Sequence, residues 1–381
     1  MIKLKELTKI LNQQFHKEYA LSWDNSGLLI GNFNEEINNI LVAIDVNDSV
    51  ISEAIKLKVN LVFSHHPLIF SPIKNIVSDS LQGQTILKLA ENKIAVYCAH
   101  TNYDLMENGL NDYIAKLLDL ENIRIIIPES LRWFKFVIFV PVEHEEKVRN
   151  AICLAGGGQW KNYSCATFKT LGKGTFKPED GSKPFIGEKG SLSIVEEARI
   201  ECIVSEDKLN NLINNVLKSH PYEEPAYDIY PLENKFETGG IGRIGNLKNY
   251  LFLNDFLSFI KEKLNLNNFK YILKSNFVLK DKEKDKEIRK IAVVNGSVNS
   301  IIEDIRYLDF DALICGEIGY HNAQMISESG KLVIEIGHGE SELFAVSHIF
   351  KILNDINEKM NFNLKIFKSK NNEMLWRYLI G

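Results

Sequence analysis

Residues 38–66, NNILVAIDVNDSVISEAIKLKVNLVFSHH, decide the fold class of this 381-residue chain. The apolar runs at 38–46 and 60–66 have the length and composition of buried strands. The stretch between them, 48–59, has the apolar spacing of a helix, and Asp48 is a candidate for its N-terminal cap. The sequence therefore predicts a strand, a helix and a second strand in direct succession.

The same alternation continues further along the chain. A helical pattern covers residues 80–93, and an apolar strand pattern covers 94–104. Strands that alternate with helices are typical of a parallel sheet covered by helices on both faces. Functional sites in such sheets form beyond the carboxyl ends of the strands. We therefore expect an α/β fold whose site lies where the strands end.

Two adjacent histidines, His65 and His66, stand at the end of one predicted strand, directly before Pro67. Neighbouring residues on a straight strand point to opposite faces, but a strand end that enters a loop can turn both toward one cavity. Imidazole is a good ligand for Zn, Fe, Mn, Co or Ni. The alternative is a polar loop with two chance histidines, and the pair alone does not decide between them.

Two other strand ends also present metal-ligating side chains. The stretch 94–104 is a predicted strand that runs into a polar loop, and His100 and Asp104 lie in that loop, where Asp104 could bridge two ions or simply form a turn. His338 and Glu342 are four residues apart and would share one helix face, although acidic residues also favour helix N-termini for electrostatic reasons. Together the three motifs offer more ligands than one tetrahedral zinc needs. They suit two ions about 3.5–4 Å apart, as in two-metal hydrolases.

Three further motifs have more than one interpretation. NGSV at 295–298 could present backbone N–H groups to a phosphate, but it has too few glycines for a P-loop and a tight turn is favoured. Glu317 and His321 could reach the strand-end cavity, or have ordinary surface or core roles. HPYEEPAYDIYPL at 220–232 could bind metal through its histidine and glutamates, but its prolines and aromatics favour a rigid, packed turn.

The pattern changes near residue 128. The predicted order becomes β-α-β-β-α-β, which is the ferredoxin-like α+β arrangement. We expect an inserted domain over 128–235 and a discontinuous α/β domain made of 1–127 and 236–381. The two flanking parts could be similar lobes, each a helix-covered sheet, that form one metal-binding unit. The inserted elements are expected at 134–142, 144–156, 164–178, 199–205, 206–220 and 226–232.

Composition restricts the class of protein. The formal net charge of −5 disfavours a general nucleic-acid binder, and no basic stripe interleaved with aromatic residues is evident. No stretch approaches the roughly 18 apolar residues of a membrane span. The five cysteines are odd in number and include no C-x-x-C pair, which favours a reduced, intracellular protein. The expected location is the cytoplasm.

In combination, these motifs resemble the NGG-one-interacting-factor-three-like family, commonly labelled GTP cyclohydrolase 1 type 2 homologues. The inserted segment is similar to the PII/CutA-like domain of the longer bacterial members, and the chain departs from many members in VVNGSVNS, which has fewer glycines. The motifs of the main domain are WDNSGLLIG (23–31), SHHPLIF (64–70), AHTNYD (99–104), CGEIGYHNAQ (315–324) and GHGESE (337–342). Those of the insertion are GGGQWKNYSCATF (156–168), GTFKP (174–178), GEKG (187–190) and HPYEEPAYDIYPL.

The resemblance implies two divalent metal ions per chain, whether Zn, Fe, Mn, Co or Ni. It places His100 and Glu317 beside the metals, where they could move protons. It further implies a ring-shaped homohexamer with the sites facing an internal cavity. The implied metal ligands are His65, His66, Asp104, His338 and Glu342.

Two functions follow from this resemblance. One is a two-metal hydrolase for GTP or a related small nucleotide-like molecule, in which the metals lower the pKa of a bound water. With GTP, the attack would open the imidazole ring at C8 and eventually release formate. The other is a regulatory or sensing protein that binds metal and has no turnover, in which the inserted domain would bind a ligand or gate the ring.

Overall fold

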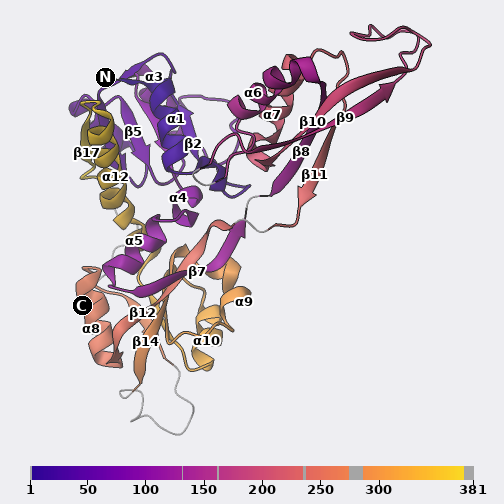
Figure 1. Cartoon of the computed structure of the whole chain (residues 1–381). Helices are drawn as coiled ribbons and strands as arrows, with labels where there is room; N and C mark the ends of the chain where they lie inside the picture. The colour runs from indigo at the N-terminus through magenta and orange to yellow at the C-terminus, as the bar shows by residue number, and fades with distance from the viewer. Residues whose placement is uncertain (1, 131, 161–162, 235–236, 274–285, 373–381) are drawn as a thin grey trace. The chain divides into compact units, whose positions relative to one another are not determined.

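The structure is a computed structural model that describes residues 2–130, 132–160, 163–234, 237–273 and 286–372 (Figure 1). The chain divides into two compact units, one made of Met1–Glu129 and Thr238–Gly381 and the other of Ser130–Glu237. Both units mix helices with sheets, so the predicted α/β class is confirmed. Among the helices that the structure describes, none is long and apolar enough to cross a membrane.

The first sheet of the larger unit contains the strands predicted from residues 38–104. Its three central strands run parallel, β17 joins them in parallel at one edge, and β2 is antiparallel at the other. In spatial order the strands are β17 (Lys365–Lys368), β4 (Asn39–Ala43), β5 (Leu61–Ser64), β6 (Ala95–Cys98) and β2 (Gly27–Ile30). Helices and a small extra sheet accompany it: β1 (Ile2–Lys3), α1 (Leu4–Gln14), η1 (Lys17–Tyr19), β3 (Glu36–Ile37), α2 (Asp48–Lys56), α3 (Leu81–Glu91), α4 (Thr101–Leu105) and α5 (Leu110–Leu117).

The second sheet of the larger unit has six strands, three of which are parallel neighbours. In spatial order they are β13 (Lys270–Ile272), β16 (Leu332–Glu335), β15 (Ala312–Glu317), β14 (Glu287–Ser297), β12 (Glu237–Phe252) and β7 (Glu121–Ser130). Its helices are α8 (Leu253–Lys263), η3 (Asn299–Ile301), α9 (Ile302–Ile305), α10 (Tyr320–Glu328) and α11 (His338–Glu342), whereas the helix that follows, α12 (Phe344–Met360), packs against β4 and β17 of the first sheet.

Successive side chains of a strand point to opposite faces of the sheet, so the buried side chains form a separate core layer on each face. On β4, Ile40 and Val42 face a large cluster that also contains Ile291 and Ile314 of the second sheet, whereas Leu41 faces a separate cluster with α2 and α3. The second sheet likewise packs its other face against α9 and α10. Both sheets are therefore covered on two faces, and one continuous core joins them.

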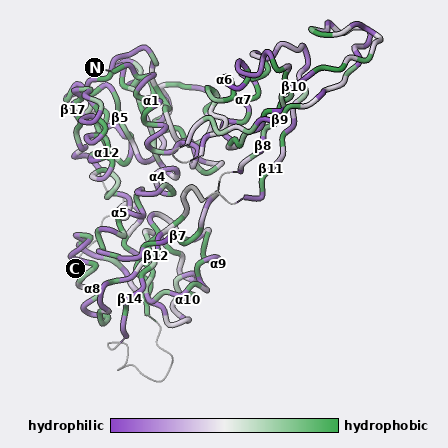
Figure 2. Tube along the Cα trace, viewed as in Figure 1, coloured by the Kyte–Doolittle hydropathy of each residue, from purple (hydrophilic) through white to green (hydrophobic). Residues whose placement is uncertain are grey.

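Helix α1 shows how the pattern produces this packing. Leu4, Leu7 and Leu11 recur at helical spacing, are buried, and share the large core cluster with β5. The trace of α1 changes repeatedly between hydrophobic and hydrophilic colours in Figure 2, as expected of an amphipathic helix. One detail of the sequence prediction is wrong: the cap of α2 is Asn47, whose side chain accepts from the N–H of Val50.

The smaller unit has the element order β-α-β-β-α-β. Its antiparallel sheet has the spatial order β11-β8-β10-β9, which places the last strand beside the first. Apolar residues on alternate positions of β8 and β10 pack against α6 and α7. The elements are β8 (Trp133–Pro141), η2 (Val142–His144), α6 (Glu145–Leu154), β9 (Thr167–Phe176), β10 (Ser193–Ser205), α7 (Glu206–Ser219) and β11 (Tyr227–Leu232).

The cysteines differ from the expectation of a reduced protein. Cys153 at the end of α6 and Cys165 just before β9 form a disulfide, whereas the other three cysteines are free and buried. The sequence offered no C-x-x-C signal because the partners are 12 residues apart. The Cα atoms of the two cysteines lie 4.9 Å apart, within the range that a disulfide requires.

Candidate metal centre

The carboxyl ends of strands from both sheets of the larger unit meet at one cluster of polar side chains. His65 and His66 directly follow β5, and Asp104 lies in α4, which follows β6. His338 and Glu342 are the first and last residues of α11, which follows β16. All five predicted ligands therefore follow the carboxyl ends of parallel strands, which is where sites form in α/β sheets.

Glu342 is the centre of this cluster and is only 2% exposed. Its Oε2 is 2.9 Å from Nε2 of His66, and its Oε1 is 3.2 Å from Nε2 of His338. The same Oε1 lies 3.8 Å from Nε2 of His65. One carboxylate from the second sheet thus faces two histidines from the first.

His65 gives the sharpest indication of a cation. Its side chain is fully buried, its Nδ1 is 3.0 Å from the carbonyl oxygen of Ala99, and its Nε2 has no hydrogen-bond partner. That Nε2 faces Asp104 and Glu342, each 3.8 Å away. Buried polar atoms are nearly always paired, so an imidazole nitrogen left between two carboxylates fits a metal ligand. The donor set suits a divalent cation.

Each of the other histidines is oriented by a carboxylate at Nδ1. The distances are 2.8 Å from His66 to Asp45, 2.9 Å from His100 to Asp24, and 3.0 Å from His338 to Glu317. Such partners fix the ring and leave Nε2 for a metal, and the carboxylate–histidine–metal arrangement is common in metalloproteins. The pattern repeats three times within the cluster.

Two overlapping groups of side chains could each hold a metal ion. One is His65, His66 and His100, and the other is His66, His338 and Glu342, with ligand atoms within 4.8 Å of one another in each group. His100 is therefore a candidate metal ligand as well as a candidate for proton transfer. Glu317 contacts the cluster through His338.

The charges of the cluster are strongly coupled. Burial opposes protonation of His66, but hydrogen bonds with Asp45 and Glu342 raise its pKa to about 10. The hydrogen bond with Glu342 raises the pKa of His338 to about 9. Burial favours a neutral Glu342, yet its histidine partners hold its pKa well below the usual range. Burial raises the pKa of Asp104. The carboxylate of Glu342 is thus stabilised by its histidine partners, whereas the ionised form of Asp104 is disfavoured by burial.

NGSV has a different role from a phosphate cradle. Asn295 donates its backbone N–H to Asn111 and its side-chain N–H to Asp104 Oδ1 at 3.0 Å, and the N–H of Gly296 donates to Ser341. These donors are already used inside the protein. The segment is the irregular end of β14, which runs to Ser297, rather than the predicted tight turn, and Asn295 there holds the carboxylate of Asp104 in place.

Two other candidates lie outside the cluster. His321 on α10 packs its ring against Tyr320, and the structure describes no contact between it and the histidine cluster. His220, in the HPYEEP segment, uses both ring nitrogens: Nε2 is 3.0 Å from the Phe139 carbonyl oxygen, and Nδ1 accepts from the N–H of Tyr222. That histidine belongs to a packed turn.

Sequence reasoning missed two of the three carboxylates that orient the histidines, since only Glu317 was named as a candidate. Asp24 was noted only as part of a motif, and Asp45 was not singled out. Each lies in a local pattern that could have marked it as a site candidate. Asp45 follows the apolar residues of a strand, and Asp24 stands in a turn-rich loop. Their partners are 21 and 76 residues away in sequence, so the pairing required the fold.

Comparison with known proteins gives a consistent family. The family profile described as Duf34/NIF3 (NGG1p interacting factor 3) matches residues 2–374. Proteins named GTP cyclohydrolase 1 type 2 homolog are similar to this chain: the one from Halalkalibacterium halodurans is 39% identical over 86% of each chain, and the one from Bacillus subtilis is 37% identical over 96% of each. The crystal structure of a Bacillus cereus protein related to NIF3 covers 99% of both chains with a TM-score of 0.75 and 34% identity.

Proposed function

Because the chain belongs to the Duf34/NIF3 family, we propose that it is a dinuclear-metal-dependent hydrolase of GTP or a related small nucleotide-like substrate. The observation that carries the proposal is the orphaned Nε2 of His65 between two carboxylates. The substrate class rests on the name of the relatives, GTP cyclohydrolase 1 type 2 homolog.

The proposed metal ligands come from both sheets of the larger unit. Two divalent cations held here would lower the pKa of coordinated water and supply a nucleophile near neutral pH. The residues that hold them would be His65, His66 and Asp104 from the first sheet, with His338 and Glu342 from the second. The two candidate groups share His66, which could ligate only one of two neighbouring ions, so support for a pair comes from the surplus of donors around it.

His100 is the residue best arranged to move a proton. Its Nδ1 is bound by Asp24, whose carboxylate also accepts from Thr101 and Ser26. Although burial opposes ionisation, the hydrogen bonds from His100 and Thr101 hold the pKa of Asp24 well below its usual range. A fixed anion at Nδ1 orients the ring and leaves Nε2 to give or take a proton. Glu317 acts through His338.

Metal content tests the ligand set. Protein purified without chelator should hold close to two transition-metal ions per chain by elemental analysis. His65→Ala and Glu342→Gln should each lower that content, because both remove a donor at the centre of the cluster. His321→Ala is the matched control, since it removes a histidine outside the cluster. Unchanged metal content in both cluster variants would refute the ligand assignment.

Turnover tests the chemistry separately. Metal-loaded protein should be assayed with GTP, related nucleotides, phosphate esters and cyclic amides. His100→Asn should cut the rate by about 10²–10⁴ if His100 transfers a proton in the transition state. Unchanged metal content in this variant would distinguish that role from metal ligation by the group of His65, His66 and His100. Full metal content without turnover on any substrate would favour the second candidate, a metal-binding regulatory or sensing protein.

We also propose that the chain assembles into a ring-shaped homohexamer. The proposal rests on the resemblance of the metal-site motifs to the NGG-one-interacting-factor-three-like family, which implies this assembly. Light scattering coupled to size-exclusion chromatography should give a mass six times the 43.5 kDa chain. A monomer or dimer at micromolar concentration would contradict the proposal.

A further inference from the structure

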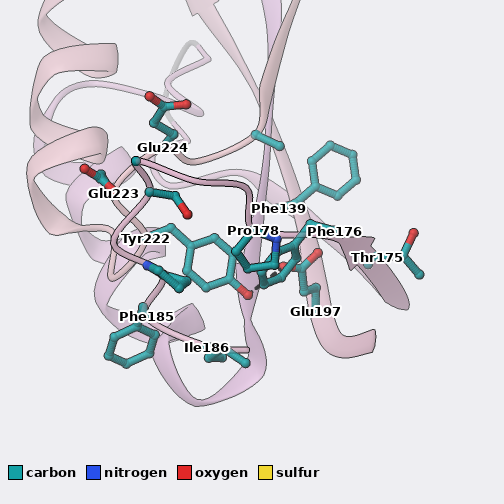
Figure 3. A pocket seen from close by; sticks show the side chains of 15 residues that line it. Phe139, Thr175, Phe176, Pro178, Phe185, Ile186, Glu197, Tyr222, Glu223 and Glu224 are labelled. Atoms are coloured by element: carbon teal, nitrogen blue, oxygen red, sulfur yellow. Dashed lines mark hydrogen bonds between the residues drawn. The ribbon is translucent and has the colours of Figure 1, made fainter. Parts of the chain in front are cut away.

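The smaller unit contains a cavity of about 560 Å³ that the metal centre does not use. It lies among β9, β10, the segment that follows β9, and the HPYEEP turn, and Figure 3 shows the ring of Tyr222 beside Glu197 within it. This volume is within the usual range for small-molecule sites. Its aromatic walls include Phe139, Phe176, Phe185 and Tyr222.

A buried carboxylate points into this cavity. Glu197 is only 8% exposed, and its Oε1 accepts a hydrogen bond from the hydroxyl of Tyr222 at 3.0 Å. The arginine two residues further along β10, Arg199, pairs with Glu201 at 2.7 Å. The structure describes no lysine or arginine paired with Glu197. A buried anion without a cation is costly, so the site favours a positively charged ligand.

The strand opposite Glu197 makes room for that carboxylate. Gly174 on β9 has no side chain, and a Cβ there would collide with Oε2 of Glu197. Gly172, two residues earlier on β9, is different, because a Cβ there would meet nothing within 4 Å. The absence of a side chain at Gly174 is therefore needed for the carboxylate of Glu197 to occupy its place beside the cavity.

The other charged residues of the lining have the same sign. Glu223 and Glu224 line the cavity, and none of its lining residues is a lysine or arginine. The backbone N–H of Lys183 holds Glu223 at 2.9 Å, which ties the segment after β9 to the turn. Tyr222 also packs edge-on against Phe176, with 5.7 Å between ring centroids. Rigid aromatic faces and carboxylates together are the features that bind organic cations.

We propose that this cavity binds a small organic cation that carries an ammonium or guanidinium group. One end of the ligand donates hydrogen bonds to the unshared oxygen of Glu197, and its apolar stem lies against the rings of Tyr222 and Phe176. Glu223 and Glu224 favour a second positive group, as in diamines, polyamines and agmatine-like molecules. Nucleotides and other anions are disfavoured by the same carboxylates.

Calorimetric titration of the full chain with putrescine, spermidine and agmatine tests this proposal. At least one amine should bind, whereas the uncharged analogue 1,4-butanediol should not. Glu197→Gln should weaken binding by tenfold or more, because hydrogen bonds to charged groups are the stronger ones. Glu196→Gln is the matched control: it removes an exposed carboxylate from the next position of β10 and should change the affinity less than twofold.

A second pair of variants keeps all charges. Gly174→Ala should weaken amine binding because its Cβ displaces the carboxylate, whereas Gly172→Ala should leave binding unchanged. Circular dichroism checks that each variant is folded. Amine binding that is equally strong in Glu197→Gln, or absent from the folded wild-type chain, would overturn the proposal. Binding of divalent metal salts but of no amine, abolished by Glu197→Gln, would also overturn it in favour of an inorganic cation.

Discussion

Replacement of Arg243 by methionine should test how the segment that bears Asp104 is held in place. The Arg243 side chain is 2% exposed and makes a bidentate ion pair with Asp112 of α5, at 2.8 and 2.9 Å. Its guanidinium also donates to the carbonyl oxygens of Gly240, Gly242 and Met106 at 2.8–3.0 Å. Met106 lies two residues after Asp104, so this arginine joins β12 to the end of α4.

The expected loss of stability follows from what Arg243→Met leaves behind. The carboxylate of Asp112 loses its cation, and three carbonyl groups lose a donor in a buried place. Removal of one partner of a buried ion pair costs about 3–5 kcal/mol. The apolar stem of methionine retains part of the packing, and water entering the gap would satisfy some carbonyls. We therefore expect a decrease of about 3–4 kcal/mol in the free energy of unfolding.

Urea denaturation followed by circular dichroism measures this change. Arg124→Met is the control, because Arg124 is exposed on β7, the neighbouring strand, and its loss should cost about 0.5 kcal/mol or less. Asp112→Asn and the double variant complete a mutant cycle, with an expected coupling of about 1–3 kcal/mol. Elemental analysis should also show a lower metal content in Arg243→Met. A destabilisation as small as that of Arg124→Met would refute the reasoning.

Three further predictions concern other parts of the chain. Burial lowers the pKa of His348 to about 4, below its ordinary value of 6.5. The contribution of this histidine to the free energy of unfolding is therefore fully present above pH 6.5 and is lost as the pH falls toward 4. His348→Gln should therefore reduce the loss of unfolding free energy between pH 7 and 4 by about 1–2 kcal/mol, after allowance for partial exposure, as measured by urea denaturation at each pH. Gly296→Ala should lower metal content, because its Cβ would lie 3.2 Å from Oε1 of Glu342, whereas Gly330→Ala, also at positive φ but with nothing within 4 Å, should not. Titration of unreduced, unfolded protein with a thiol reagent should find three free thiols per chain and five after reduction, and Cys153→Ser should give four in both conditions.

The local sequence pattern predicted most of the first sheet. The strands β4, β5 and β6 are each recognisable from a run of three to six apolar residues, and their predicted ranges extend two to six residues beyond the observed C-terminal ends. The excess lies where residues such as His65 and Asp104 leave the ladder, because apolar composition does not mark the last hydrogen bond of a strand. Burial of both sheet faces made these strands recognisable.

The candidate metal-ligating residues could be predicted from the sequence, but the residues that they contact in the fold could not. His65 and His66 stood out because two histidines followed an apolar run. The pairing of His66 with Glu342 spans 276 residues and depends on both sheets sharing one core. No periodicity in the sequence encodes that distance. The disulfide between Cys153 and Cys165 was missed for a related reason, since no motif marks two cysteines that are 12 residues apart.

The arrangement of the cluster implies that the metal centre is a place where stability is reduced in favour of function. Asp104 and Glu342 both face one buried imidazole nitrogen, and burial disfavours ionisation of both carboxylates. A well-packed apolar group at the position of His65 would avoid an unpaired buried nitrogen. The protein instead keeps donors from two sheets within reach of one point. A cation there would satisfy the nitrogen and both carboxylates at once, so its binding free energy would add directly to the cohesion of the two sheets.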